Sequence, residues 1–225
     1  MTDTLYALYP VFRADPEVRS AFADPEDRAR ATREVEDLVK RLGDRVTLRG
    51  SYSTVGFRAD ADLLLWLTGP TAEDVQHALV EFRRTEIGAY LELTWSFMGV
   101  VKPAEFSPDH APAFVKGDPP QDYLCVYPFV RTAEWYLLPP EERAALLRDH
   151  GGTGREFPEV VGNTTSAFGL GDWEWILAFE SPKLDSIVDV IRLLRATEAR
   201  RFTKVEVPFV TGIRKPIGAC IDDCC

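Results

Sequence analysis

The chain has 225 residues, 45% of them hydrophobic, enough to bury one large core or two domains of about 100 residues each. Its formal net charge of −10 argues against nucleic acid or an anionic membrane as a partner. The sequence has no apolar run near the roughly 18 residues of a membrane span, and its start lacks the features of a signal peptide. We therefore expect a globular protein with a cytoplasmic location.

The first half is expected to fold as an α+β unit in the order β-α-β-β-α-β. Pro16 lies near the start of the first expected helix, Gly43 lies just beyond its end, and Thr71 caps the second helix. The expected elements are a strand at 4–13, a helix at 16–41, strands at 45–55 and 61–68, a helix at 71–87 and a strand at 91–101.

A proline-rich stretch, residues 102–121, reads as an extended connector between two domains. The second half repeats the order of the first, with a strand at 122–131, a helix at 139–150, strands at 159–168 and 173–180, a helix at 183–201 and a strand at 203–211. Each half is thus a ferredoxin-like unit with an antiparallel sheet. We predict two fused repeats of the dimeric α/β barrel type, an N-terminal one at 1–101 without the ligand site and a C-terminal one at 122–225 that carries it.

The two halves are also similar in sequence. Leu8–Arg13 recurs as Val126–Arg131 at an offset of 118, and residues 56–90 align without a gap on 168–202 at an offset of 112. Among the matched positions are Tyr9/Tyr127, Arg13/Arg131, Leu65/Leu177, Arg83/Arg195, Thr85/Thr197 and Glu86/Glu198. A repeat of this length indicates two copies of one domain, so the residues that differ between the copies are the best guide to function.

Two histidines, His110 and His150, have no counterpart in the first half. His150 ends the expected helix 139–150, directly before Gly151 and Gly152. It is either a cationic cap on the last helix carbonyls or a neutral imidazole that binds a metal. The sequence near it offers no second histidine and no paired cysteine or glutamate for a zinc site. The metal reading therefore favours haem iron, whose other four bonds come from the macrocycle.

In the strand 122–131, Tyr127 and Arg131 share one face because side chains alternate. Tyr127 is either structural, as Tyr9 in the matching place suggests, or a redox residue, since phenol is oxidised more easily than most side chains. Arg131 and Arg195 are either members of structural ion pairs or clamps for carboxylates, which arginine binds through bidentate hydrogen bonds.

The cysteines add little to the functional reading. Cys125 lies in an apolar strand and reads as a small buried residue. Cys220, Cys224 and Cys225 end the chain without a nearby histidine, which does not make a zinc signature. We expect these three residues to form a frayed tail.

Five segments carry a resemblance to a known family: Tyr127-Pro128-Phe129-Val130-Arg131, Glu134-Trp135-Tyr136-Leu137-Leu138-Pro139, Arg148-Asp149-His150-Gly151, Asp172-Trp173-Glu174-Trp175 and Arg195-Ala196-Thr197-Glu198-Ala199. Together they resemble the chlorite-dismutase-like family, and within it the actinobacterial coproheme decarboxylases. The resemblance covers nearly the whole chain. It implies a pair of ferredoxin-like domains assembled as a homopentamer.

The resemblance also implies roles for individual residues. His150 matches the proximal ligand of the haem iron, Tyr127 the tyrosine that becomes a radical, and His110 the distal histidine that takes a proton from hydrogen peroxide. Three residues match positions that line the porphyrin and its propionates: Arg131, Trp135 and Arg195.

The implied reaction is the oxidative decarboxylation of iron coproporphyrin III (coproheme) by hydrogen peroxide. Two propionates become vinyl groups and the product is haem b, so that the substrate serves as its own redox cofactor. An iron-inserting ferrochelatase would act upstream. The tyrosine has to lie close to the propionate that reacts, and the arginines fix which propionate is presented.

Two alternative functions are a chlorite dismutase-like haem peroxidase and a haem carrier or sensor. By family pattern a chlorite dismutase needs a distal arginine, and the sequence has no arginine between Arg155 and Arg192. A carrier needs His150 but neither Tyr127 nor His110, and the sequence leaves that alternative open.

Overall fold

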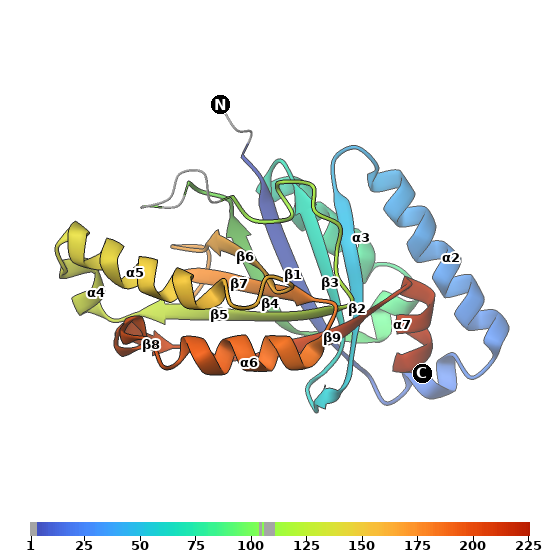
Figure 1. The fold of residues 1–225 in the computed structure, drawn as a ribbon. Helices are drawn as coiled ribbons and strands as arrows, with labels where there is room; N and C mark the ends of the chain where they lie inside the picture. Colours follow the sequence, from blue (N-terminus) through green and yellow to red (C-terminus); the bar gives the residue numbers. More distant parts are fainter. Residues whose placement is uncertain (1–3, 104, 106–110) are drawn as a thin grey trace. The chain divides into compact units, whose positions relative to one another are not determined.

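The computed structural model describes residues 4–103, 105 and 111–225, which divide into two compact units (Figure 1). The first unit is Met1–Val101 with Val210–Cys225, and the second is Lys102–Phe209. Within the described ranges, no helix is both long enough and apolar enough to cross a bilayer.

The first unit is built on an antiparallel sheet with the strand order β4-β1-β3-β2-β9. Its strands are β1 (Tyr6–Ala14), β2 (Thr47–Arg58), β3 (Ala61–Gly69), β4 (Leu91–Val100) and β9 (Val210–Lys215). The connection through a helix places β1 and β2 apart, and β3 returns between them as the partner of both. This split β-α-β order confirms the predicted ferredoxin-like α+β repeat.

The helices of the first repeat are α1 (Val18–Ala21), α2 (Pro25–Leu42), α3 (Ala72–Arg83) and the 3₁₀ turn η1 (Ile87–Tyr90). The single helix expected at 16–41 is two helices, because a new one begins at Pro25. Asp24 caps it by accepting the N–H of Glu26 at 2.9 Å, and proline suits the first helical position. Three side chains of α2 are buried in the core of this unit: Ala31, Val35 and Leu38.

The end of the chain belongs to the first unit, not to the second repeat as the sequence suggested. Strand β9 pairs with β2, with Ser51 opposite Lys215, and the helix α7 (Ile217–Cys224) follows. The prediction of a frayed tail is therefore wrong. Cys220 and Cys224 are buried in the hydrophobic core, and burial raises the pKa of the Cys220 thiol to about 11. These cysteines act as small apolar core residues.

The second unit repeats the topology, with the strand order β6-β7-β5-β8. Its strands are β5 (Tyr123–Arg131), β6 (Val161–Ser166), β7 (Trp175–Ser181) and β8 (Thr203–Val205). The last strand expected, 203–211, is interrupted: β8 ends at Val205, and the chain reaches β9 through residues 206–209. Proline at 208 has no N–H for a ladder hydrogen bond, which is consistent with the interruption.

The helices of the second unit are α4 (Ala133–Leu137), α5 (Pro140–Gly154), α6 (Leu184–Leu194) and the 3₁₀ turn η2 (Glu198–Phe202). The expected glycine stop after His150 is wrong, because α5 continues through Gly151 and Gly152 to Gly154. An interior glycine costs a helix only about 1 kcal/mol relative to alanine. Every side chain of α5 is at least partly exposed, unlike those of α2. The helix therefore adds no fully buried side chain to the core.

Candidate haem site in the second unit

One pocket in the second unit gathers residues from β5, α5, β7, α6 and the segment after α6. The space between these residues and the solvent in front of them amounts to about 490 Å³, so the pocket is open at the surface. It is lined by Tyr127, Phe129, Arg131, His150, Leu177, Ile191, Leu194, Arg195, Ala199, Arg200, Thr203 and Glu206. Four of the six predicted site residues are among them: Tyr127, Arg131, His150 and Arg195.

The other two predicted residues are placed differently. Trp135 lies in α4 and is buried, with the guanidinium of Arg131 4.3 Å from the centre of its ring. It supports Arg131 and does not line the pocket itself. His110 lies outside the residues that the structure describes.

His150 is held by a threonine that follows α6. Its Nδ1 lies 3.2 Å from the hydroxyl oxygen of Thr197, and that hydroxyl donates its own hydrogen to the carbonyl of Leu194 at 2.8 Å. The threonine oxygen therefore accepts from His150, which places the imidazole hydrogen on Nδ1. The lone pair on Nε2 is left available to bind a metal, as in histidine sites where a hydrogen bond fixes the tautomer.

The surroundings of His150 keep the imidazole neutral. Its pKa lies below the ordinary value of 6.5, first because burial disfavours the charged form and then because the cation of Arg131 repels it. A neutral imidazole is the form that binds iron. Among the described residues, no three of His, Cys, Asp and Glu converge to hold a metal ion. A haem iron takes four of its bonds from the macrocycle, so a single histidine such as His150 could serve as its protein ligand.

Tyr127 lies on the wall of the pocket with only 4% of its surface exposed. Its ring stacks on Phe209, with 4.4 Å between the ring centres. Burial raises the pKa of its phenol well above 10, and the negative charge of Glu206 adds to this effect. The phenol therefore keeps its O–H at neutral pH, and that O–H is a hydrogen that can be removed by oxidation.

Arg131 is a partly buried cation that no carboxylate of the described residues neutralises through an ion pair. Its Nη1 donates to the carbonyl of Ala199 at 3.1 Å, and its guanidinium also lies over the ring of Phe129. Burial lowers its pKa from the ordinary value, although arginine remains charged. Glu206 and Glu174 attract its charge without forming an ion pair with it, so its free N–H donors favour an anionic ligand.

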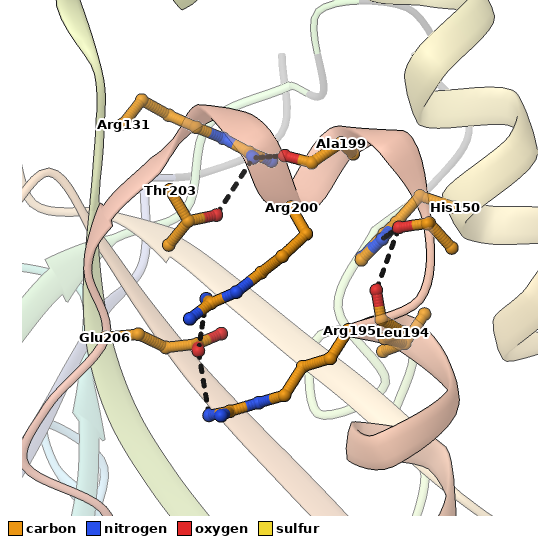
Figure 2. A network of polar contacts seen from close by, with 9 residues as sticks. Arg131, His150, Leu194, Arg195, Ala199, Arg200, Thr203 and Glu206 are labelled. Carbon is orange, nitrogen blue, oxygen red and sulfur yellow. Dashed lines mark hydrogen bonds and ion pairs between the residues drawn. The ribbon is translucent and has the colours of Figure 1, made fainter.

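On the other side of the pocket, two arginines share one carboxylate (Figure 2). Arg195 donates to Oε2 of Glu206 at 2.9 Å, and Arg200 donates to the same oxygen at 2.6 Å. The lining thus holds three arginines against one glutamate, in a chain whose net charge is −10. This is the local positive cluster that a carboxylate-bearing ligand requires.

The sequence identified Arg195 but missed Arg200, Glu206 and the role of Thr197. A signal for Arg200 was present, because it aligns with Gly88 at the offset of 112 and so differs between the copies. Thr197 matches Thr85, so a comparison of the two copies gives no reason to assign it a role in the site. Glu206 lies beyond the aligned segment, in the interruption between β8 and β9, where the repeat gives no guide.

The chain is similar in sequence to known proteins of one family. The model of the chlorite dismutase family matches residues 28–215. A coproheme decarboxylase of Mycolicibacterium smegmatis is 46% identical over 211 residues, which cover 93% of this chain and 89% of that protein. Another from Staphylococcus carnosus is 27% identical over 192 residues, 77% of this chain and 76% of that protein.

The fold is found in solved structures as well. A chlorite dismutase from Candidatus Nitrospira defluvii in complex with imidazole superposes with a TM-score of 0.86. The match covers 98% of this chain and 94% of that one at 24% sequence identity. At this identity the likeness speaks for the fold alone.

Proposed function

The chain belongs to the chlorite dismutase family, and we propose that it is a coproheme decarboxylase. Its substrate is iron coproporphyrin III, a tetrapyrrole that carries four propionates, and its product is haem b. The observation that carries the proposal is one pocket that brings together His150, whose Nδ1 contacts the hydroxyl of Thr197, the buried phenol of Tyr127 and three arginines. The haem carrier needs only the first of these features.

Each of the two decarboxylations is a two-electron oxidation. One propionate, one molecule of hydrogen peroxide and one proton give a vinyl group, carbon dioxide and two molecules of water. The bond between the propionate's α-carbon and its carboxylate carbon breaks, and one hydrogen leaves the β-carbon. The iron of the bound substrate would react with hydrogen peroxide. The protein provides the residues that hold the substrate and move the hydrogen.

His150 binds the iron through Nε2 and thereby places the ring in the pocket. Arg131 binds a propionate from one side, and Arg195 with Arg200 does so from the other. These contacts decide which propionate is presented to Tyr127, since hydrogen abstraction demands close approach. Tyr127 loses its O–H hydrogen on oxidation, and its radical then removes the hydrogen from the β-carbon.

His110 is proposed as the group that takes a proton from hydrogen peroxide. Loss of such a base typically costs 10²–10⁴-fold in rate, which alkaline pH restores in part because peroxide then ionises unaided. The test is the rate of product formation by His110→Ala from about pH 7 to 9. A defect that pH leaves untouched would remove His110 from this role.

The assembly and the cellular setting are proposals that the family resemblance supports. We expect a homopentamer in the cytoplasm that receives its substrate from an iron-inserting ferrochelatase. Light scattering coupled to size-exclusion chromatography measures the mass of the assembly, to be compared with five times 25.3 kDa.

The experiment that tests the function adds iron coproporphyrin III to the protein and titrates hydrogen peroxide. Mass spectrometry should show two successive losses of one carbon dioxide and two hydrogens, and the absorption spectrum should become that of haem b. Binding without any loss of mass would instead support a haem carrier. Release of dioxygen from chlorite without decarboxylation would support a chlorite dismutase.

A further inference from the structure

Glu206 occupies the position where a ligand carboxylate would be expected. One of its oxygens, Oε2, accepts hydrogen bonds from both Arg195 and Arg200 (Figure 2). The carboxylate is more buried than its partners: its side chain is 19% exposed, whereas Arg195 is 46% and Arg200 is 37% exposed. The arginines that the proposed function assigns to the substrate are thus already paired.

We propose that Glu206 is an internal competitor for the substrate's carboxylate. A propionate that binds to Arg195 and Arg200 takes over the donors that Glu206 holds before binding. When that propionate loses carbon dioxide and becomes a vinyl group, it can no longer accept hydrogen bonds, and Glu206 pairs with the arginines again. The inference rests on the proposed function and assigns the arginine pair to a propionate that reacts.

Three observations favour exchange over a permanent pair. Two guanidinium groups converge on a single oxygen, so most of their ten N–H donors point elsewhere and one positive charge stays uncompensated. Glu206 follows β8 directly and lies in the interruption before β9, so no strand hydrogen-bonding fixes its backbone. Its charge also acts on Tyr127 and both residues line the pocket, so the carboxylate faces the space that a ligand would enter.

Exchange also agrees with the energetics of the pair. A glutamate that left for good would leave Arg195 and Arg200 without a carboxylate in a pocket that also holds the cation of Arg131. A substrate carboxylate replaces one negative charge by another, so the pocket keeps the same balance of charge throughout. The cost of displacing Glu206 should therefore appear as weaker binding of the substrate, not as a loss of folding.

The test measures the dissociation constant of metal-free coproporphyrin III by its fluorescence. Without iron there is no bond to His150, so the carboxylate contacts dominate the affinity. Glu206→Gln keeps the size of the side chain and removes its charge, and it should lower the dissociation constant at least about tenfold, a factor worth about 1.4 kcal/mol. The tetramethyl ester of the same porphyrin, which has no carboxylates, should show no such gain.

Glu198→Gln is the matched control, since it removes the same charge from an exposed ion pair with Arg201 in the same unit. It should leave the dissociation constant within about twofold, because exposed pairs contribute little and salt screens them. Glu206→Asp is a second variant that keeps the charge but withdraws the carboxylate by one methylene. It should give an affinity between those of the native chain and Glu206→Gln.

Equal or weaker binding by Glu206→Gln would overturn the inference and make Glu206 a residue that only holds the arginines in position. An equal gain for the ester would overturn it as well, because the gain would then not depend on carboxylates. If the native chain bound neither iron coproporphyrin nor the metal-free form, the proposed function itself would fail. The two failures are therefore distinguishable.

Discussion

The helix after the first strand packs differently in the two units. In the first unit, α2 buries Ala31, Val35 and Leu38 in the core, whereas in the second every side chain of α5 stays at least partly exposed. The same topology thus has a helix that packs into the core in one copy and a helix without a fully buried side chain in the other. His150 lies on this second helix and lines the pocket.

The matched threonines show how a shared residue acquires a new role. Thr85 donates to the carbonyl of Phe82 at 2.7 Å, and its oxygen accepts the backbone N–H of Gly88. Thr197 makes the equivalent bond to Leu194, but its oxygen faces His150. The local turn is unchanged, and the acceptor that closes a turn in one copy orients a histidine in the other.

The residue that aligns with Gly88 is Arg200. A β-carbon at Gly88 would lie 2.0 Å from the carbonyl oxygen of Phe82, so the first unit has no room for a side chain there. In the second unit the turn η2 admits an arginine, which reaches Glu206. The second unit lacks this packing constraint, so the matching position can hold Arg200, a cation that lines the pocket.

The largest effect should come from exchanging each tyrosine for phenylalanine. Tyr127→Phe should bind coproheme and react with peroxide but form product at least about 10²-fold more slowly, because it lacks the O–H hydrogen. Tyr9→Phe, its counterpart, should retain the rate of the native chain. The rate is measured by mass spectrometry of the product, and substantial haem b from Tyr127→Phe would contradict the assignment.

The next effect concerns the iron ligand. His150→Ala should raise the dissociation constant of coproheme by more than about tenfold, since even the partners of metal ligands typically contribute 10–100-fold. His77, an exposed histidine of α3 in the first unit, supplies the control variant His77→Ala. Absorption titration reports affinity and iron coordination together. An unchanged spectrum for His150→Ala would move the ligand elsewhere.

Variants of the matched arginines should also differ in their affinity for coproheme, and only the second-unit arginine should matter. Arg131→Ala should weaken coproheme binding by about 1.5–3 kcal/mol, the usual contribution of a hydrogen bond to a charged group. Arg13 forms an exposed ion pair with Glu92 at 2.6 Å, and Arg13→Ala should leave affinity unchanged. Equal losses of affinity in the two variants would mean that the first unit also contributes to the site.

Variants of the two matched threonines should distinguish a role in the turn from a role in the site. Thr85→Val and Thr197→Val should each lower the free energy of unfolding, by about 1–3 kcal/mol where the turn is buried. Only Thr197→Val should also weaken coproheme binding and shift the nitrogen resonances of His150 in the ligand-free protein, and Thr197→Ser should restore both. Unchanged resonances in Thr197→Val would show that the histidine's tautomer is set by another contact.

The smallest effect is the pH dependence of iron binding. A proton competes with iron for Nε2, so affinity is lost only as pH falls through the pKa of His150, which lies below 6.5. Affinity measured from about pH 8 to 5 should therefore decline later than for an exposed imidazole. Removing the repulsion in Arg131→Ala should move the decline to higher pH. A decline centred at or above 6.5 in the native chain would contradict this.

Much of the fold could be predicted because alternation, helical periodicity and turn residues repeat in both halves. The final segment could not, since the burial of Cys220 and Cys224 depends on the core they join and not on local pattern. In the site, Tyr127 and His150 were identifiable from the sequence. The pairing of Arg200 with Glu206 was not, because it depends on the turn η2 and on the interruption after β8, although the mismatch of Arg200 with Gly88 could be read from the repeat.

The return of the chain to the first unit has a consequence for how the protein folds. Residues 51 and 215 are 164 positions apart, yet the hydroxyl of Ser51 donates to the carbonyl of Lys215 at 2.6 Å. Contacts between residues so distant in sequence slow folding, because the chain between them must close into a loop first. During synthesis at about 5–20 residues per second, the first unit's sheet edge and the core against α7 wait until β9 and α7 have emerged. The first unit is therefore completed only after the whole second unit has been made.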